Sequence, residues 1–183
     1  MTFRRALSAI SSPGDVIDLP VIPEMPEGVD PAAAALLLAL LDQDTVLWIS
    51  PGLSGSDADA YFRFHTGCRM TNAPEEAGFL LVAGPQDCPP LKALNCGSDE
   101  YPEQAATLVV QVQALSSADG WVLRGPGING SRRLSVAGLA DRFAAEWGEM
   151  RRDFPRGVDI FFVNGSRLAA LPRSTTVEGP PCM

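Results

Sequence analysis

The stretch TVLWIS at residues 45–50 decides the fold class. It is short, uninterrupted and rich in β-branched and aromatic residues, a pattern typical of a strand buried on both faces. The run AAAALLLALL at residues 32–41 precedes it. That run predicts a helix from Pro31 to Asp42, covered on most sides because it is apolar nearly all round. Asp30 is expected to cap this helix, with Pro31 at its first position.

The elements around this pair alternate between helix and strand. A helix is predicted from residues 56–57 to about His65, with Gly67 ending it. A strand at residues 79–83 and a short helix at residues 90–94 follow. Alternation of this kind is typical of the α/β class.

The N-terminal segment predicts one more helix and one short strand. The helix covers residues 3–10 and places Phe3, Leu7 and Ile10 on one face. The sequence SSPG stops it, and residues 16–19 then form a brief strand.

The second half predicts two antiparallel hairpins and a long helix. In the first hairpin, ATLVVQVQAL and WVLRGPGI (residues 121–128) are joined by a turn at SSADG (residues 116–120). The helix follows at residues 136–150. In the second hairpin, VDIFFVNG and RLAALPRST are joined by NG at residues 164–165. The sequence thus predicts a single α/β domain with a mixed sheet over residues 1–183.

Composition excludes several classes of partner. A content of 46% hydrophobic and 20% charged residues indicates a folded globular protein. The net charge of -8 and the lack of a basic stripe argue against nucleic acid and anionic membrane as partners. The most apolar helix would be about 18 Å long, against a hydrocarbon core of about 30 Å, so it predicts no membrane span.

The cysteines and the N-terminus indicate a cytoplasmic protein. The four cysteines show no CxxC spacing and are expected to be free thiols in a reducing compartment. With only one histidine in the chain, they match no familiar zinc pattern, so no metal is expected. The sequence MTFRRALSAISSPGD is broken by polar residues, proline and glycine before it could form the apolar core of a signal peptide.

The sequence FRFHTG at residues 62–67 contains His65, the only histidine. A histidine at a helix C-terminus is favoured by the helix dipole and can bind the last carbonyl groups, which is a structural role. Arg63 and Thr66 lie beside it, and the three side chains together could bind an oxygen of a phosphate or phosphonate. Spacing alone does not choose between these interpretations.

Arg156 and Arg173 are the other candidate site residues, each next to a proline at a strand boundary. Each alone suggests a structural salt bridge, whereas two at adjoining strand ends suggest a binding site. The acids of GSDEYPE, at residues 97–103, form either a solvated turn or a metal or proton-transfer loop. GPGI at residues 125–128 is followed by no lysine, unlike a P-loop, so no nucleotide cofactor is predicted.

Several blocks of the chain occur in an order that resembles the PhnH family, a subunit of the bacterial carbon-phosphorus lyase system. The resemblance covers nearly the whole chain. The blocks are FRRALSAISSPG, LLDQDTVLWIS, FRFHTG, PEQAATLVVQV, GPGI, FPRGVDIFFV and LPRSTTVE. The chain starts almost at FRR, where the resemblance leads us to expect a longer leader.

The resemblance implies a fold, partners and a role. The fold is similar to the large domain of the fold-type I pyridoxal-phosphate transferases. The partners are a second copy, in a homodimer, and the G, I and J subunits of a core complex that degrades alkylphosphonates. The role is to assist formation of ribose 1-phosphonate 5-triphosphate from ATP and a phosphonate, as a non-catalytic or co-catalytic subunit. The cofactor itself is not expected, because Lys92, the only lysine, lies next to no recognisable phosphate-binding cup.

The alternative is an autonomous enzyme acting on phosphoryl groups or using pyridoxal phosphate. Such an enzyme would use His65 together with the arginines. The sequence identifies the candidates Arg63, His65, Thr66, Arg156 and Arg173 without assigning a catalytic role to any of them.

Overall fold

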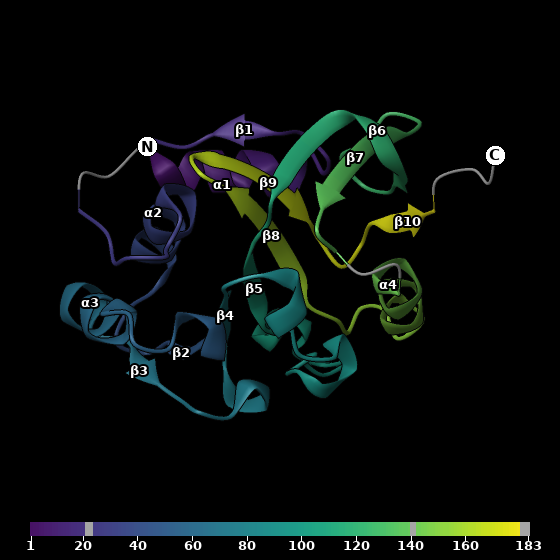
Figure 1. The fold of residues 1–183 in the computed structure, drawn as a ribbon. Coiled ribbons are helices and arrows are strands. Elements are labelled where there is room, and N and C mark those ends of the chain that lie inside the picture. Colours follow the sequence, from purple (N-terminus) through teal and green to yellow (C-terminus); the bar gives the residue numbers. More distant parts are fainter. Residues whose placement is uncertain (21–23, 140–141, 180–183) are drawn as a thin grey trace.

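A computed structural model describes residues 1–20, 24–139 and 142–179 (Figure 1). Its centre is a seven-stranded sheet in the order β1-β9-β8-β5-β4-β2-β3. The strands β3, β2, β4, β5 and β8 run parallel, β9 pairs antiparallel with β8, and β1 pairs antiparallel with β9. The bounds are β1 Ile17–Asp18, β2 Val46–Ile49, β3 Arg69–Met70, β4 Phe79–Val82, β5 Thr107–Gln111, β8 Asp159–Asn164 and β9 Arg167–Leu171. The predicted α/β class with a mixed sheet is confirmed.

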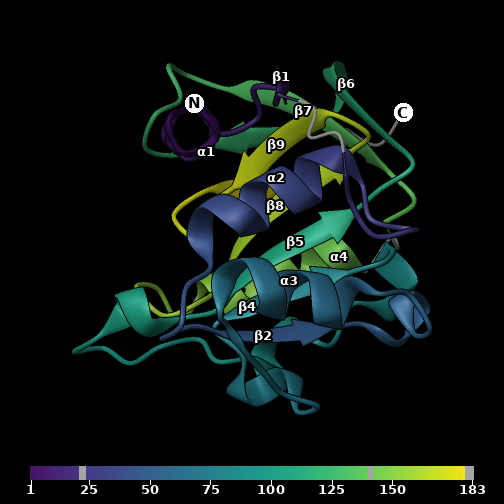
Figure 2. The ribbon, with the colours of Figure 1, turned by 90° about the vertical axis from the view of Figure 1, so that its left-hand side faces the viewer.

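Both faces of this sheet are covered, as the continuous apolar strands require. Successive residues of a strand point to opposite faces, and in β4 the side chain of Leu81 joins one core while its neighbours Leu80 and Val82 join the other. Figure 2 shows α2 (Pro31–Leu40) and α3 (Ala58–Thr66) in front of the sheet and α4 (Phe143–Arg151) behind it. The helix α3, which carries Arg63, His65 and Thr66, thus lies on the opposite face of the sheet from α4.

The helix α2 is buried as its composition predicts, with all residues from Ala32 to Leu37 out of solvent. The expected cap by Asp30 is wrong. Asp30 stands at the capping position, but its side chain makes no capping bond, and its Oδ2 accepts a hydrogen bond of 3.0 Å from the backbone N–H of Gly165. Asp30 therefore ties the start of α2 to the turn after β8.

A second sheet, in the order β10-β6-β7, corrects the first predicted hairpin. The residues SSADG form no turn, because they lie inside the long strand β6 (Ala114–Arg124). The pairing of β6 with β7 (Arg132–Ala137) shifts register between Ser116 and Trp121, and Gly120 lies against the backbone of Leu134, where a Cβ would come within 2.4 Å of the carbonyl oxygen. Close backbone approach thus explains the glycine. The third strand, β10, is Thr176–Glu178.

The predicted helix at residues 136–150 is also too long. Val136 pairs with Leu115 as part of β7, and α4 begins only at Phe143. The short helix predicted near Lys92 is a single 3₁₀ turn, Leu91–Ala93. Four further 3₁₀ turns occupy Pro51–Leu53, Pro74–Glu76, Pro85–Asp87 and Pro102–Gln104. No helix in the described part of the chain is long and apolar enough to cross a membrane.

Two turn predictions are confirmed. Gly67 ends α3 in the left-handed conformation, with φ 73°, and its N–H donates to the carbonyl of Arg63. The strands β8 and β9 form an antiparallel hairpin at the NG pair, where Gly165 has φ 58°. Glycine adopts such φ values without the steric penalty that a Cβ imposes.

The first helix, α1 (Thr2–Ser11), forms as predicted but buries another face. Ala6 and Ala9 are buried, whereas Phe3 and Leu7 are each 52% exposed. Small side chains on the buried face let the helix come close to α2 and β9, its main neighbours.

Candidate functional site

The candidates on α3 lie in the helix that covers one face of the sheet. Arg63 forms an exposed ion pair of 3.7 Å with Asp59, one turn earlier. The hydroxyl of Thr66 donates to the carbonyl of Phe62 at 2.7 Å and accepts the N–H of Cys68 at 3.1 Å. Thr66 thus secures the end of the helix, and its hydroxyl is already engaged in both directions.

The side chain of His65 is exposed, and its ring shares no hydrogen bond with a described residue. Its ring lies 4.5 Å from that of Tyr61 and 5.1 Å from that of Phe64, measured between centroids. The expected bond from His65 to the last carbonyl groups is therefore not present. The capping role belongs to Gly67 and Thr66, which leaves the dipole interaction and the aromatic contacts to His65.

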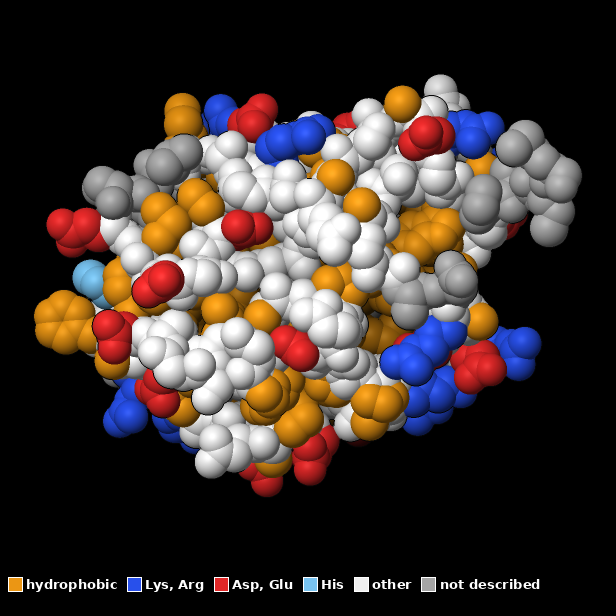
Figure 3. Space-filling view, viewed as in Figure 1, with side chains coloured by type: hydrophobic (Ala, Val, Ile, Leu, Met, Phe, Trp, Pro, Cys, Tyr) orange, Lys and Arg blue, Asp and Glu red, His pale blue; other side chains and the backbone are white. Residues whose placement is uncertain are grey.

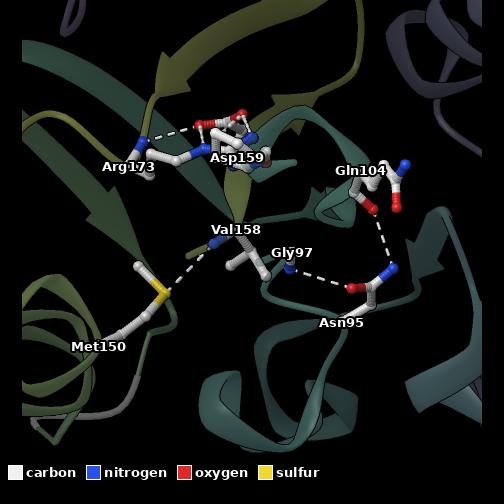
Figure 4. A network of polar contacts seen from close by, with 8 residues as sticks. Asn95, Gly97, Gln104, Met150, Val158, Asp159 and Arg173 are labelled. Carbon is white, nitrogen blue, oxygen red and sulfur yellow. Dashed lines mark hydrogen bonds and ion pairs between the residues drawn. The ribbon is translucent and has the colours of Figure 1, made fainter. Parts of the chain in front are cut away.

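Arg156 and Arg173 lie at adjoining strand ends, the arrangement that the sequence left open. Arg156 precedes β8, and Arg173 follows β9, the antiparallel neighbour of β8. Arg156 Nε lies 3.4 Å from Asp99 in an exposed pair. Arg173 is held much more firmly, since its Nη2 and Nε bind the carboxylate of Asp159 at 2.5 and 3.2 Å (Figure 4).

A small hollow beside Arg156 has a volume of about 170 Å³, and we call it the basic hollow. It is lined by Lys92, Cys96, Met150, Asp153, Arg156 and Gly157. Burial raises the pKa of the Cys96 thiol above its ordinary value of 9.0, although the charges of Arg156, Arg173 and Lys92 act to lower it. The thiol is therefore protonated at neutral pH and is not an activated nucleophile.

The structure does not bring the candidates of α3 and the two arginines together. The buried residues of α3 belong to the core on one face of the sheet, whereas Met150 of the basic hollow belongs to the core on the other face. In Figure 3 the single histidine lies at the left margin, and blue Lys and Arg side chains gather near α4 on the right. A site that combines His65 with Arg156 and Arg173 is thus not formed within this chain.

A second hollow, missed by the sequence analysis, lies at the carboxyl ends of β4, β5 and β8. Its volume is about 300 Å³, and we call it the carboxyl-edge hollow. It is lined by Asp30, Ala83, Gly84, Pro85, Gln86, Gln111, Val112, Gln113 and Asn164. In open α/β sheets, ligands bind outside the carboxyl ends of the strands, which makes this the expected place for a ligand.

Gln111 organises the carboxyl-edge hollow from the end of β5. Its side chain accepts the N–H of Asp30 at 2.6 Å and donates to the carbonyl of Gly28 at 2.9 Å. Burial raises the pKa of the Asp30 carboxyl above its ordinary value of 3.8, while the hydrogen bond from Gly165 opposes that shift. The signal in the sequence was a glutamine inside the apolar run LVVQV, where a buried amide must find partners.

A larger hollow of about 420 Å³ lies on the other side of the loop after β2, with Ser50, Thr71 and Asn72 among its lining residues. No Lys, Arg or His side chain is among the described residues that line it. Among the described residues, no group of three or more histidine, cysteine or acidic side chains could hold a metal ion.

Comparison with known proteins identifies the family. The family described as "Bacterial phosphonate metabolism protein (PhnH)" matches residues 1–178. The chain is 34% identical over 176 residues to "Alpha-D-ribose 1-methylphosphonate 5-triphosphate synthase subunit PhnH" of Rhizobium meliloti (strain 1021), covering 96% of this chain and 88% of the relative. It is 33% identical over 177 residues to "Putative C-P lyase subunit protein HtxG" of Stutzerimonas stutzeri, covering 96% of this chain and 84% of that relative. A match of this extent, in the order of blocks that the sequence shows, means that the chain belongs to the PhnH family of bacterial phosphonate metabolism proteins.

Proposed function

We propose that this chain is a subunit of the carbon-phosphorus lyase core complex in alkylphosphonate catabolism. In that complex it assists formation of ribose 1-phosphonate 5-triphosphate from ATP and a phosphonate. The observation that carries this proposal is the family match over residues 1–178, together with a relative whose name specifies a synthase subunit.

The arrangement of the side chains supports a non-catalytic or co-catalytic role. Arg63, Arg156 and Arg173 each have an acidic partner, and His65 has no hydrogen-bonded partner in the described part of the chain. A general base needs a partner that orients it, and a nucleophile needs a base within hydrogen-bonding reach. The autonomous enzyme, which would combine His65 with the arginines, is the less favoured alternative because these groups lie on different layers.

The proposed partners are a second copy of the chain and the G, I and J subunits. Several large apolar side chains remain on the surface: Met1, Phe3, Leu7, Phe64, Tyr101 and Phe154. Phe64 is 85% exposed on a regular helix, and aromatic side chains of this kind often anchor protein interfaces. The cytoplasmic location and the similarity to the large domain of pyridoxal-phosphate transferases belong to the same proposal.

The proposal is tested in a bacterial strain that lacks its own PhnH-family subunit. Supplying this chain should restore growth on methylphosphonate as the sole phosphorus source, and a tagged copy should co-purify with the G, I and J subunits. Growth on inorganic phosphate is the control. The purified chain alone should release no adenine from ATP and methylphosphonate. Adenine release by the chain alone would instead establish the autonomous enzyme.

A further inference from the structure

The hydrogen-bonding groups of the carboxyl-edge hollow are partly used within the protein. Both amide hydrogens of Asn164 are used, because its Nδ2 donates to the carbonyls of Val112 and Gln113, each at 3.0 Å. The Nε2 of Gln111 likewise donates to Gly28 and Ala83. Donors on these two amides are thus consumed within the protein.

Two acceptor oxygens of the hollow have no hydrogen-bond donor among the described residues. Asp30 Oδ2 accepts the N–H of Gly165, but no described residue donates to Asp30 Oδ1 or to Asn164 Oδ1. A carboxylate and an amide oxygen thus remain available at the rim of the hollow. A ligand group that binds these two oxygens must present hydrogen-bond donors, while the side-chain amides of Gln86 and Gln113 in the same lining can donate to it.

The charge of the lining excludes one class of group. Asp30 is the only charged side chain among the described lining residues, and no described Lys or Arg in the lining balances it. A phosphate or phosphonate oxygen would be repelled there, whereas hydroxyl groups would be bound. A volume of about 300 Å³ lies at the lower end of the usual range for ligand pockets, which suits a sugar ring.

We propose that the carboxyl-edge hollow binds the two neighbouring hydroxyl groups of a ribose unit, with the Asp30 carboxylate as the principal acceptor. The identity of the sugar rests on the proposed function, since the product named for the relative's synthase contains a ribose. A carboxylate near a strand end binds ribose hydroxyls in other α/β proteins, which shows that the chemistry suits this position. Asn164 Oδ1 is the second acceptor.

A structural role for Asp30 is the competing explanation, and Asp30→Asn separates the two. The asparagine oxygen still accepts the N–H of Gly165, so the link between α2 and the turn after β8 is retained. The variant removes the negative charge and one acceptor from the hollow. The matched control is Asp119→Asn, which removes the same charge from an exposed position in β6.

The test is calorimetric titration of the purified full-length chain with adenosine and with 2′,3′-dideoxyadenosine. We expect adenosine to bind, and loss of both hydroxyls to weaken binding at least about tenfold, since hydrogen bonds to a charged group are strong. Asp30→Asn should weaken adenosine binding to a similar degree, and Asp119→Asn should leave it unchanged.

Three results would overturn the inference: no adenosine binding, equal binding of the two nucleosides, or unchanged binding by a folded Asp30→Asn variant. None of them affects growth on methylphosphonate with the unmodified chain, which tests the proposed function separately. Conversely, the chain could bind adenosine through its hydroxyl groups and yet fail to restore growth. That result would support the ribose site and contradict the proposed function.

Discussion

The pair formed by Asp159 and Arg173 offers the sharpest test of what the arginines do. Asp159 starts β8, and Arg173 lies just after β9, so the pair joins the open end of the hairpin. Their side chains are only 22% and 15% exposed. Asp159 Oδ1 also accepts the backbone N–H of Arg173 at 2.8 Å, and Arg173 Nη1 donates to the carbonyl of Pro102.

Replacing Asp159 by asparagine should be costly, because the new amide group places a donor or a neutral oxygen against the guanidinium. Breaking a fully buried pair by removing one partner costs about 3–5 kcal/mol. Since this pair is partly exposed, we expect the free energy of unfolding to fall by about 2–3 kcal/mol. For a domain of this size that corresponds to a fall in Tm of roughly 4–12 °C. Arg173→Lys keeps the charge but loses the planar fork, and should cost about 1–2 kcal/mol.

The assay is urea and thermal unfolding of both variants, with Asp99→Asn as the control. Asp99 pairs with Arg156 at the surface, where ion pairs contribute about 0–1 kcal/mol. If Asp159→Asn unfolds with the same midpoint as Asp99→Asn, the pair does not hold the hairpin and our reasoning is wrong. If Arg173→Lys unfolds like the parent but abolishes growth on methylphosphonate, Arg173 serves the substrate and its role is not structural.

Three further predictions concern single side chains. His65→Gln should preserve complex assembly and growth on a phosphonate, at a cost in stability of no more than about 1 kcal/mol, and His65→Ala should cost more. Normal melting and assembly of His65→Gln with loss of phosphonate use would instead show chemistry at His65. Incubation with pyridoxal phosphate should produce no absorption band of an internal aldimine, and a stable band that disappears in Lys92→Ala would contradict this. Because burial raises the pKa of Asp30 above 3.8, its charged form is disfavoured in the folded state, so stability falls as the pH rises through the raised pKa. Asp30→Asn should therefore melt at or above the parent at pH 7, with the two curves converging as the pH falls toward 3.8, and a variant several degrees less stable at pH 7 would refute this.

The parts of the fold that the sequence predicted correctly are those in which local chemistry and tertiary structure agree. VLWI and IFFV are apolar without interruption, and they lie in the strands β2 and β8 of the seven-stranded sheet. The glycines at positions 67 and 165 stand where the backbone needs positive φ. In each case the residues of one short stretch determine the local conformation, so the prediction did not depend on any distant residue.

The errors arise where a distant strand decides the conformation. SSADG has the composition of a turn, yet it lies within β6, because Ser116 and Trp121 on either side of the irregularity pair with the adjacent residues Ser135 and Leu134 of β7. Val136 belongs to β7 for the same reason. The face of α1 was predicted from large apolar residues, but a close approach to β9 favours alanine.

The candidate site was predicted only in part, because its geometry also depends on segments that are distant in the sequence. The sequence placed Arg156 and Arg173 each at a strand boundary, and the register of β8 and β9 brings these two strand ends together. It could not show that α3 lies on the other face. It also passed over Asn164 and Gln111, although a polar residue in or after an apolar strand signals a hydrogen-bonded group.

The separation of the two hollows bears on how such a subunit would act. The basic hollow adjoins the residues before β8, and Asn164 of the carboxyl-edge hollow ends the same strand. A strand of six residues at about 3.3 Å each places the two ends roughly 20 Å apart. A ribose bound at the carboxyl edge therefore could not extend its triphosphate into the basic hollow. No described Lys or Arg side chain lines the carboxyl-edge hollow, so the triphosphate of a ribose bound there would meet its cations outside this hollow. A subunit that binds the sugar while another part of the assembly binds the phosphates would be essential to the reaction and inactive alone.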